Sequence, residues 1–391
     1  MNDPLTLTLG DDFPEIREGV RRICADFPGA YWRDLDEREA YPSEFVRAMT
    51  EAGYLAALIP EEFGGAGLPL RAAGVILEEV HASGGNAGAT HAQMYTMGTV
   101  LRHGSPAQKA RYLPEIAAGT LRLQAFGVTE PTTGTDTTKL KTRAVRDGDH
   151  YIVNGQKIWT SRALYSDLML LLARTTPLEE VKKKTEGLSV FLVDMRRAVG
   201  NGMTIRPIKA MINHNTTEVF FDNLRIPADS LVGVEGQGLR HIMDGMNAER
   251  ILVSHESIGD AKWFVKTAVQ YANERVVFGR PIGQNQGIQF PIAKAYASAQ
   301  AAELMLRRAA AAFEAGLPCG EEANLGKLLS AEAAWEAAEA CMQTLGGFAY
   351  AREYDVERKW REARVQRTAP ISTNLILSYI AEHVLGLPRS Y

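Results

Sequence analysis

The spacing of apolar residues changes twice along the 391-residue chain, and each change marks a switch between helices and strands. From Pro14 to about Gly119 the apolar residues recur at helical spacing. From about Leu121 to Gly233 they form short β-branched or aromatic runs bounded by glycine, asparagine and proline, which is typical of strands. From Gly236 onward long helical segments return. This helix–strand–helix order predicts an α+β, multidomain fold.

We expect three domains: an N-terminal helical domain over residues 1–122, a central β-barrel or β-sandwich over residues 123–235, and a C-terminal four-helix bundle over residues 236–391. The bundle is predicted from four long helical segments with short connections between them. These helices are expected at roughly 237–275, 288–315, 321–345 and 372–386. No G-x-G-x-x-G follows a strand, which argues against a Rossmann nucleotide site.

The central section contains two short patches of polar and aromatic residues, Thr129-Glu130-Pro131 and Trp159-Thr160-Ser161. Between them, Asp147-Gly148 and Asn154-Gly155 are dipeptides typical of tight β-hairpins, whose turns need positive φ. We therefore predict that the two patches meet on neighbouring strands. An indole face with threonine and serine hydroxyls suits a flat ring that accepts and donates hydrogen bonds. The alternative is an ordinary meander whose hydroxyls face water, and residue types alone leave both open.

Charge and composition exclude several classes of protein. The net charge of -4 and pI near 6.1 argue against a nucleic-acid partner. Cys24, Cys319 and Cys341 show no close pairing, and the histidines lack ligand spacing, so we expect no disulfide framework and no metal. The N-terminus lacks a basic segment followed by an apolar one, and no apolar run approaches eighteen residues. We expect a cytoplasmic protein without a signal peptide or membrane span.

The stretch from Phe126 to Ser161 resembles the flavin-binding segment of the acyl-CoA dehydrogenase family. The matching positions are Val128, Thr129, Glu130, Pro131, Gly134 and Asp136, followed by Asn154, Gly155, Lys157, Trp159 and Ser161. Thr132, Thr133, Thr135 and Thr160 depart from the family pattern, and Thr132 adds bulk where the family has glycine. Further matches run in order through nearly the whole chain. The resemblance implies the three-domain architecture given above and FAD as the cofactor.

The resemblance also implies which residues hold the flavin. Val128, Thr129, Trp159 and Ser161 would lie at the ring. Arg275 and Phe278 resemble the E-R-x-x-F-G segment that reaches the flavin of a neighbouring subunit, and an arginine fork suits a pyrophosphate. The remaining implied contacts are Gln286, Gln343, Gly346, Gly347, Ser372 and Asn374.

The family removes the α-proton of an acyl thioester with a carboxylate, while the β-hydrogen leaves as hydride to the flavin N5. Its usual late position for that base is Pro370 here, so that base is absent. A minority of the family, including isovaleryl- and long-chain-type enzymes, carries the base on an earlier helix directly before an arginine. Glu249, followed by Arg250, matches that position and is the predicted catalytic base. For an isolated glutamate, an exposed helix position would be the default interpretation.

Substrate contacts are implied as well. Thr135, Asn247 and Arg250 would lie near the thioester and the pantetheine arm. Met94 and Tyr95, with Met97, are candidate walls of the acyl pocket, although plain core packing explains the methionines equally well. Pro370 also lacks the backbone N–H that helps to polarise the substrate carbonyl in the family, and the Ile371 N–H is a candidate replacement.

The resemblance further implies an acyl-CoA substrate, a homotetramer and an electron-transfer flavoprotein as electron acceptor. Two other activities stay open on the same scaffold. One is an enoyl-CoA reductase of the crotonobetainyl-CoA type, and the other is a flavin monooxygenase, which would need no carboxylate at Glu249. A flavin-free binding protein is a further alternative, against which the retained ring and phosphate contacts argue.

Overall fold

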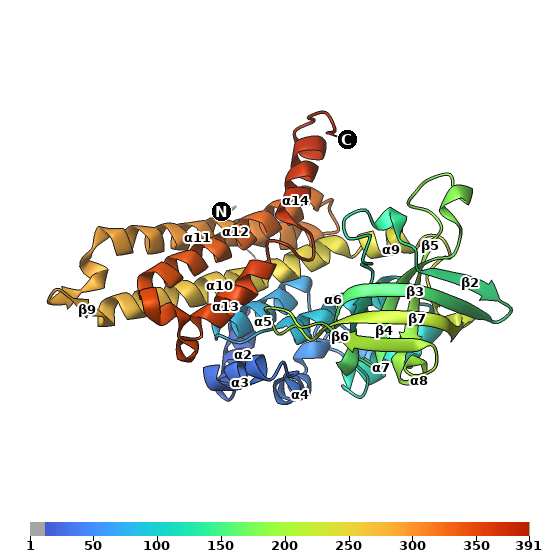
Figure 1. The fold of residues 1–391 in the computed structure, drawn as a ribbon, viewed down its shortest axis with the longest axis horizontal. Coiled ribbons are helices and arrows are strands. Elements are labelled where there is room, and N and C mark those ends of the chain that lie inside the picture. The colour runs from blue at the N-terminus through green and yellow to red at the C-terminus, as the bar shows by residue number, and fades with distance from the viewer. Residues whose placement is uncertain (1–11, 391) are drawn as a thin grey trace, which may run out of the picture. The chain divides into compact units, whose positions relative to one another are not determined.

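The computed structural model describes residues 12–390 (Figure 1). The expectation that no signal peptide is present rests mostly on residues 1–11, which lie outside this range. The described chain divides into two compact units. One contains the residues up to Glu37, Pro69–Ala87 and the chain from Asn247 onward; the other contains Arg38–Leu68 and Gly88–Met246. We call them the helical unit and the sheet unit.

The helical unit is built from long helices. They are α2 (Pro14–Ala25), α3 (Gly29–Glu37), α5 (Leu70–Ala82), α10 (Met246–Glu274), α11 (Gln286–Glu314), α12 (Gly320–Leu345), α13 (Val356–Val365) and α14 (Thr373–Tyr379). Helices α11 and α12 lie side by side (Figure 1). Gly326 of α12 permits this close approach, because a Cβ there would lie 3.5 Å from the Cα of Leu306. Three of the four long C-terminal helices expected from the sequence are therefore present, whereas the segment expected at 372–386 is the seven-residue α14 followed by a π-helix over Ile380–Val384.

Two details of the helix pattern differ from expectation. The segment expected as one helix over 237–275 is two, α9 (Gly238–Met243) and α10, with Gly245 between them. Glycine carries the largest entropic cost in a helix, which accounts for the break. Helix α13 was not expected, because its sequence is dominated by charged residues; four of its ten residues are arginine or lysine.

Buried ion pairs tie the shorter helices of the helical unit to α10. Glu78 of α5 accepts hydrogen bonds from Arg17 of α2 (2.9 Å) and from Lys262 of α10 (2.6 Å). His255 of α10 lies 2.9 Å from the same carboxylate. Despite the burial of this carboxylate, the neighbouring donors and cations hold the pKa of Glu78 well below its ordinary value. Glu78 is thus an ionised link between three helices.

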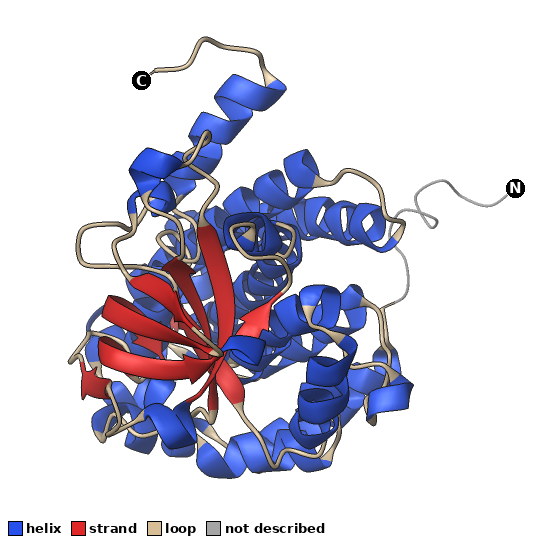
Figure 2. Ribbon diagram, turned by 90° about the vertical axis from the view of Figure 1, so that its right-hand side faces the viewer, coloured by secondary structure: helices blue, strands red, loops and turns tan. Residues whose placement is uncertain are grey.

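In the sheet unit, helices flank one mixed sheet. The helices are α4 (Ser43–Glu51), α6 (Gly88–His103), α7 (Pro106–Ala117), α8 (Met195–Ala198) and α9. The strands are β1 (Leu123–Gly127), β2 (Arg143–Asp147), β3 (His150–Ser161), β4 (Leu168–Arg174), β5 (Leu188–Asp194), β6 (Met203–Pro207), β7 (Thr216–Pro227) and β8 (Leu231–Val232). Within the described residues the strand order is β6-β7-β3-β2-β4-β5-β8, and β1 pairs with β4 in parallel (Figure 2). The helical–β–helical order expected from the sequence is confirmed.

Strand β4 explains how the sheet is held. Successive side chains of a strand point to opposite faces. Leu168, Leu170 and Leu172 belong to a core cluster that includes residues of α6 and α7, whereas Met169 and Leu171 belong to a second cluster on the other face. Every residue of β4 is buried, as expected for a strand covered on both faces.

The two predicted hairpin dipeptides behave differently. Asp147-Gly148 does form the turn between β2 and β3, with Gly148 at φ +59°. The prediction of a hairpin at Asn154-Gly155 is wrong, because this dipeptide lies inside β3. The pairing with β7 shifts register between Val153 and Gly155, which makes the site a bulge. A Cβ at Gly155 would lie 2.6 Å from the Thr142 Cα, so the glycine serves close backbone approach there.

Among the helices of residues 12–390, none has both the length and the apolar character that crossing a membrane requires.

Candidate active site

The two patches singled out in the central section lie next to each other in the sheet unit. The Ile158 N–H donates to the Thr129 carbonyl at 2.9 Å, and Lys157 Nζ donates to the Val128 carbonyl at 3.0 Å. The patches therefore meet, as predicted, although Val128 and Thr129 follow β1 as a loop and are not part of a neighbouring strand. This brings Val128 and Thr129 next to the strand that carries Trp159 and Ser161.

Glu130 holds the loop that follows β1. Its carboxylate accepts from Lys157 Nζ (2.9 Å) and from the backbone N–H groups of Lys141 (2.6 Å) and Thr142 (2.8 Å). Burial opposes the charge, but the Lys157 ammonium and these donors lower the pKa of Glu130. Burial lowers the pKa of Lys157 to about 8. The sequence motif included both residues, but it did not indicate that they form a buried ion pair.

Trp159 and Ser161 lie at the end of β3. Trp159 has φ +60° and is 59% exposed, at a point where the register between β3 and β7 shifts. Positive φ is uncommon for a residue with a bulky side chain, and it is found most often where function constrains the backbone. The Ser161 hydroxyl lies 3.4 Å from that of Thr216. An exposed indole beside a hydroxyl and the Thr129 loop is a surface that can receive a flat, polar ring.

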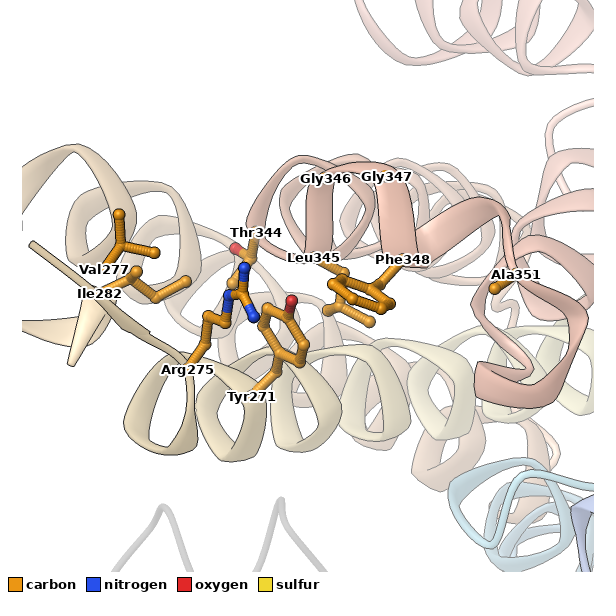
Figure 3. A pocket seen from close by; sticks show the side chains of 10 residues that line it. All are labelled: Tyr271, Arg275, Val277, Ile282, Thr344, Leu345, Gly346, Gly347, Phe348 and Ala351. Carbon is orange, nitrogen blue, oxygen red and sulfur yellow. The ribbon is translucent and has the colours of Figure 1, made fainter.

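A cavity of about 650 Å³ lies in the helical unit, at the ends of α10 and α12 (Figure 3). Its lining includes Arg275, Gly346, Gly347 and Phe348. The Arg275 guanidinium lies 5.5 Å from the centre of the Phe348 ring, and no described residue forms an ion pair with it. Gly346 has φ +58° and ψ −129°, a conformation that glycine adopts readily. A cation without a carboxylate partner, next to two glycines, fits a phosphate group.

Three of the predicted cofactor residues therefore share this cavity although Arg275 and Gly346 are far apart in the sequence. The other predicted residues of the helical unit do not line it. Phe278 is fully exposed in the turn between β9 (Val276–Val277) and β10 (Arg280–Pro281), and Gln286 begins α11. Gln343 is exposed on the last turn of α12. Ser372 caps α14, with its hydroxyl accepting from the Leu375 N–H at 3.3 Å, and Asn374 is exposed on the first turn.

The predicted base lies at the start of α10. Glu249 is 6% exposed, in contrast to the exposed position that an ordinary helical glutamate takes. Arg250 is buried beside it and donates to the Asn247 side-chain oxygen at 2.8 Å. Burial lowers the pKa of Arg250, and the negative charge of Glu249 opposes that shift. The helical unit thus places a buried carboxylate against a buried guanidinium.

A lysine that the sequence pattern did not single out completes this group. Lys327 of α12 is buried, and its ammonium donates to the backbone carbonyls of Gln366 and Ile371 (3.0 Å for Ile371). Glu249 and Arg250 both act on its charge. Pro370 lies between the two carbonyls, in the loop from α13 to α14.

The predicted substrate residues of the sheet unit lie on α6 and in a loop. Met94 is buried, and Tyr95 packs edge to face against Phe126, with ring centres 5.5 Å apart. Met97 belongs to the core cluster of the sheet unit, which favours the packing interpretation for that residue. Thr135 is exposed. In the described part of the chain, no three histidine, cysteine, aspartate or glutamate side chains are grouped so that they could hold a metal ion.

Comparisons with known proteins agree with this description. Family models match residues 11–120 (acyl-CoA dehydrogenase, N-terminal domain), 125–224 (middle domain) and 236–385 (C-terminal domain). The chain is 33% identical over 379 residues to acyl-CoA dehydrogenase FadE12 of Mycobacterium tuberculosis, covering 96% of each protein. It is 31% identical over 359 residues to 3-(aryl)acrylate reductase of Clostridium sporogenes, covering 90% of this chain and 94% of the relative. A solved glutaryl-coenzyme A dehydrogenase in complex with glutaryl-CoA superposes with a TM-score of 0.90 at 29% identity, with 97% of each chain covered. The chain belongs to the acyl-CoA dehydrogenase family.

Proposed function

We propose that this protein binds FAD and oxidises the Cα–Cβ bond of an acyl-CoA thioester with Glu249 as the α-proton base. The observation that carries the proposal is the burial of Glu249 beside Arg250, combined with proline at the family's usual base position. Burial of a carboxylate is costly unless cations or donors compensate it. Two buried cations, Arg250 and Lys327, act electrostatically with Glu249 and offset part of that cost.

The residues present fit FAD at both ends. Trp159, Thr129 and Ser161 of the sheet unit would contact the isoalloxazine ring of one FAD. Arg275 and Gly346 of the helical unit would hold the pyrophosphate and adenosine end of the FAD that belongs to a neighbouring subunit. When bound, FAD supplies the oxidant, because it accepts the Cβ hydrogen with its electron pair. Glu249 takes the Cα proton, and the two electrons of the Cα–H bond become the new double bond.

The thioester carbonyl gains negative charge as the α-proton leaves, so a donor at its oxygen accelerates the step. Pro370 has no N–H. We propose the Ile371 N–H for this role, since no backbone or side-chain acceptor within residues 12–390 pairs with it. Asn247 and Thr135 would contact the thioester and the pantetheine arm, and Met94 and Tyr95 would line the acyl pocket.

The decisive variant is Glu249→Gln, which keeps the shape of the side chain but removes its basicity. We expect normal flavin content and a loss of about 10²–10⁴-fold in the rate at which acyl-CoA thioesters bleach the flavin anaerobically. Glu303→Gln is a matched control, because Glu303 is a mostly buried carboxylate paired with Lys262 (3.0 Å) on the neighbouring helix. Unchanged bleaching in Glu249→Gln would refute the base assignment.

A second candidate is the reverse reaction, reduction of an enoyl thioester or an aryl acrylate. The relative named 3-(aryl)acrylate reductase favours it. Chemically reduced protein should then be reoxidised by a 2-enoyl substrate much faster than saturated thioesters bleach the oxidised form. The opposite ratio of rates supports dehydrogenation.

The proposal includes a homotetramer in the cytoplasm that passes electrons to an electron-transfer flavoprotein. Arg275 and Phe278 are exposed at the tip of the helical unit. The family resemblance implies that they contact the flavin of a neighbouring subunit, and such a contact requires an assembly. Light scattering should give about four times the 42.9 kDa chain mass. A flavin-loaded monomer would contradict the assembly.

A further inference from the structure

Lys327 differs from the other buried lysines of the described chain. Lys157 lies 2.9 Å from Glu130, and Lys359 lies 2.5 Å from Asp260, so each has a carboxylate partner. Lys327 is equally buried, yet no described carboxylate lies within ion-pair distance of its ammonium. Burying an ammonium without a carboxylate partner is costly. A residue of this kind needs a reason beyond packing, since a methionine would fill the same space.

The ammonium of Lys327 holds one loop at two points. It donates to the carbonyl of Gln366, at the end of α13, and to the carbonyl of Ile371, just before α14 (3.0 Å). The side chain of Gln366 is held as well, because its amide donates to Glu256 of α10 at 3.2 Å. The backbone between these points carries Pro370. Lys327 therefore anchors the segment that carries the Ile371 N–H on both sides, together with the Thr373 N–H, which donates to the Arg367 carbonyl at 3.1 Å.

We propose that Lys327 is a positioning residue for the dehydrogenation reaction: by holding the Gln366 and Ile371 carbonyls, it fixes the loop that presents the Ile371 N–H to the thioester carbonyl. This inference rests on the proposed function, in which Glu249 is the base. Lys327 touches neither substrate nor flavin in this scheme, and it acts through the loop.

The test compares Lys327→Met, which removes donors and charge, with Lys327→Arg, which keeps both. Flavin bleaching by butyryl-, isovaleryl-, octanoyl- and glutaryl-CoA is followed in stopped flow. We expect Lys327→Met to lower the limiting rate by about a hundredfold, the usual cost of a misplaced reacting group. The thioester concentration for half-maximal rate should change less than about threefold. Lys327→Arg should keep most of the wild-type rate.

Ser330→Ala is the matched control, since Ser330 is buried one turn along α12 and bonds only the Lys327 backbone carbonyl (3.3 Å). It should leave the limiting rate unchanged. Hydrogen exchange of the 366–373 segment gives a readout that needs no reaction, and it should rise in Lys327→Met alone.

Wild-type rates in Lys327→Met overturn the positioning role. Unchanged exchange in that variant overturns the loop contact. If none of the four thioesters bleaches the wild-type flavin, the proposed function fails, and raised exchange then upholds only the contact between Lys327 and the loop.

Discussion

Lys157 and Glu130 form a buried ion pair, with 2.9 Å between Nζ and Oε1, that joins strand β3 to the loop after β1. The same ammonium donates to the Val128 carbonyl at 3.0 Å. The pair therefore holds the two patches proposed to contact the flavin ring at a fixed separation. The pair fixes the geometry of the two patches and adds little net stability, because the cost of desolvating both charges offsets much of their attraction. Removing one partner is nevertheless costly, since it leaves the other charge buried and unpaired.

Breaking that pair should destabilise the sheet unit. Lys157→Met and Glu130→Gln are each expected to lower the free energy of unfolding by about 3–5 kcal/mol, because either change leaves a buried group without its partner. The double variant should lose less than the sum of the two, by about 1–3 kcal/mol. Guanidinium denaturation of the flavin-free protein gives the free energy of unfolding of the wild type, the two single variants and the double variant. Strict additivity would mean that the two side chains do not interact in solution.

Arg275→Ala should weaken FAD binding by about ten- to a hundredfold, which corresponds to the loss of charge-assisted hydrogen bonds worth about 1.5–3 kcal/mol. Arg280→Ala is the control, because Arg280 is a nearby exposed arginine that instead donates to the Asn285 side chain at 2.8 Å. Titration of apoprotein with FAD gives both constants. Equal FAD affinity in the two variants would show that Arg275 does not contact the cofactor.

Gly346→Ala should cost about 1–3 kcal/mol of stability, whereas Gly347→Ala should cost much less. A Cβ at either position would meet nothing within 4 Å, so crowding is excluded for both. Only Gly346 has positive φ, and its φ +58° and ψ −129° disfavour any residue with a Cβ. Comparing the melting temperatures of Gly346→Ala and Gly347→Ala isolates the cost of the positive φ at residue 346. Similar melting temperatures would show that the backbone at Gly346 can adopt another conformation.

Because Lys327 is buried, we expect the free energy of unfolding to depend on pH in a specific way. Burial lowers its pKa in the folded protein to about 8, from an ordinary value of 10.5. Below pH 8 the ammonium is charged in both the folded and the unfolded chain, so the cost of burying the charge lowers stability in full. Between pH 8 and 10.5 the unfolded chain binds more protons, so stability rises with pH. Wild type should gain about 3 kcal/mol relative to Lys327→Met across that window. Denaturation at pH 7, 8, 9 and 10 measures the difference, and a flat difference would refute the lowered pKa.

Short-range features of this chain were predictable from the sequence. The turn at Asp147-Gly148 depends on the backbone preferences of two residues, and it forms as expected. The order of helical and strand-rich sections follows from the spacing of apolar residues. Asn154-Gly155 carried the same local signal but became a bulge, because β3 continues along β7 on both sides of it. Pairing with a distant strand outweighed the local turn preference.

The sequence by itself determined the order of the elements and the chemistry available to them: a tryptophan and hydroxyls near the central strands, a glutamate before an arginine, and a proline in place of the usual base. Only the tertiary structure decided which of these groups come together. Arg275 meets Gly346 in one cavity, Lys157 meets Glu130, and Lys327 reaches the Ile371 carbonyl without a carboxylate of its own. The physical reason is that propensity and periodicity act over a few residues, whereas burial and charge depend on neighbours that only the folded chain brings close.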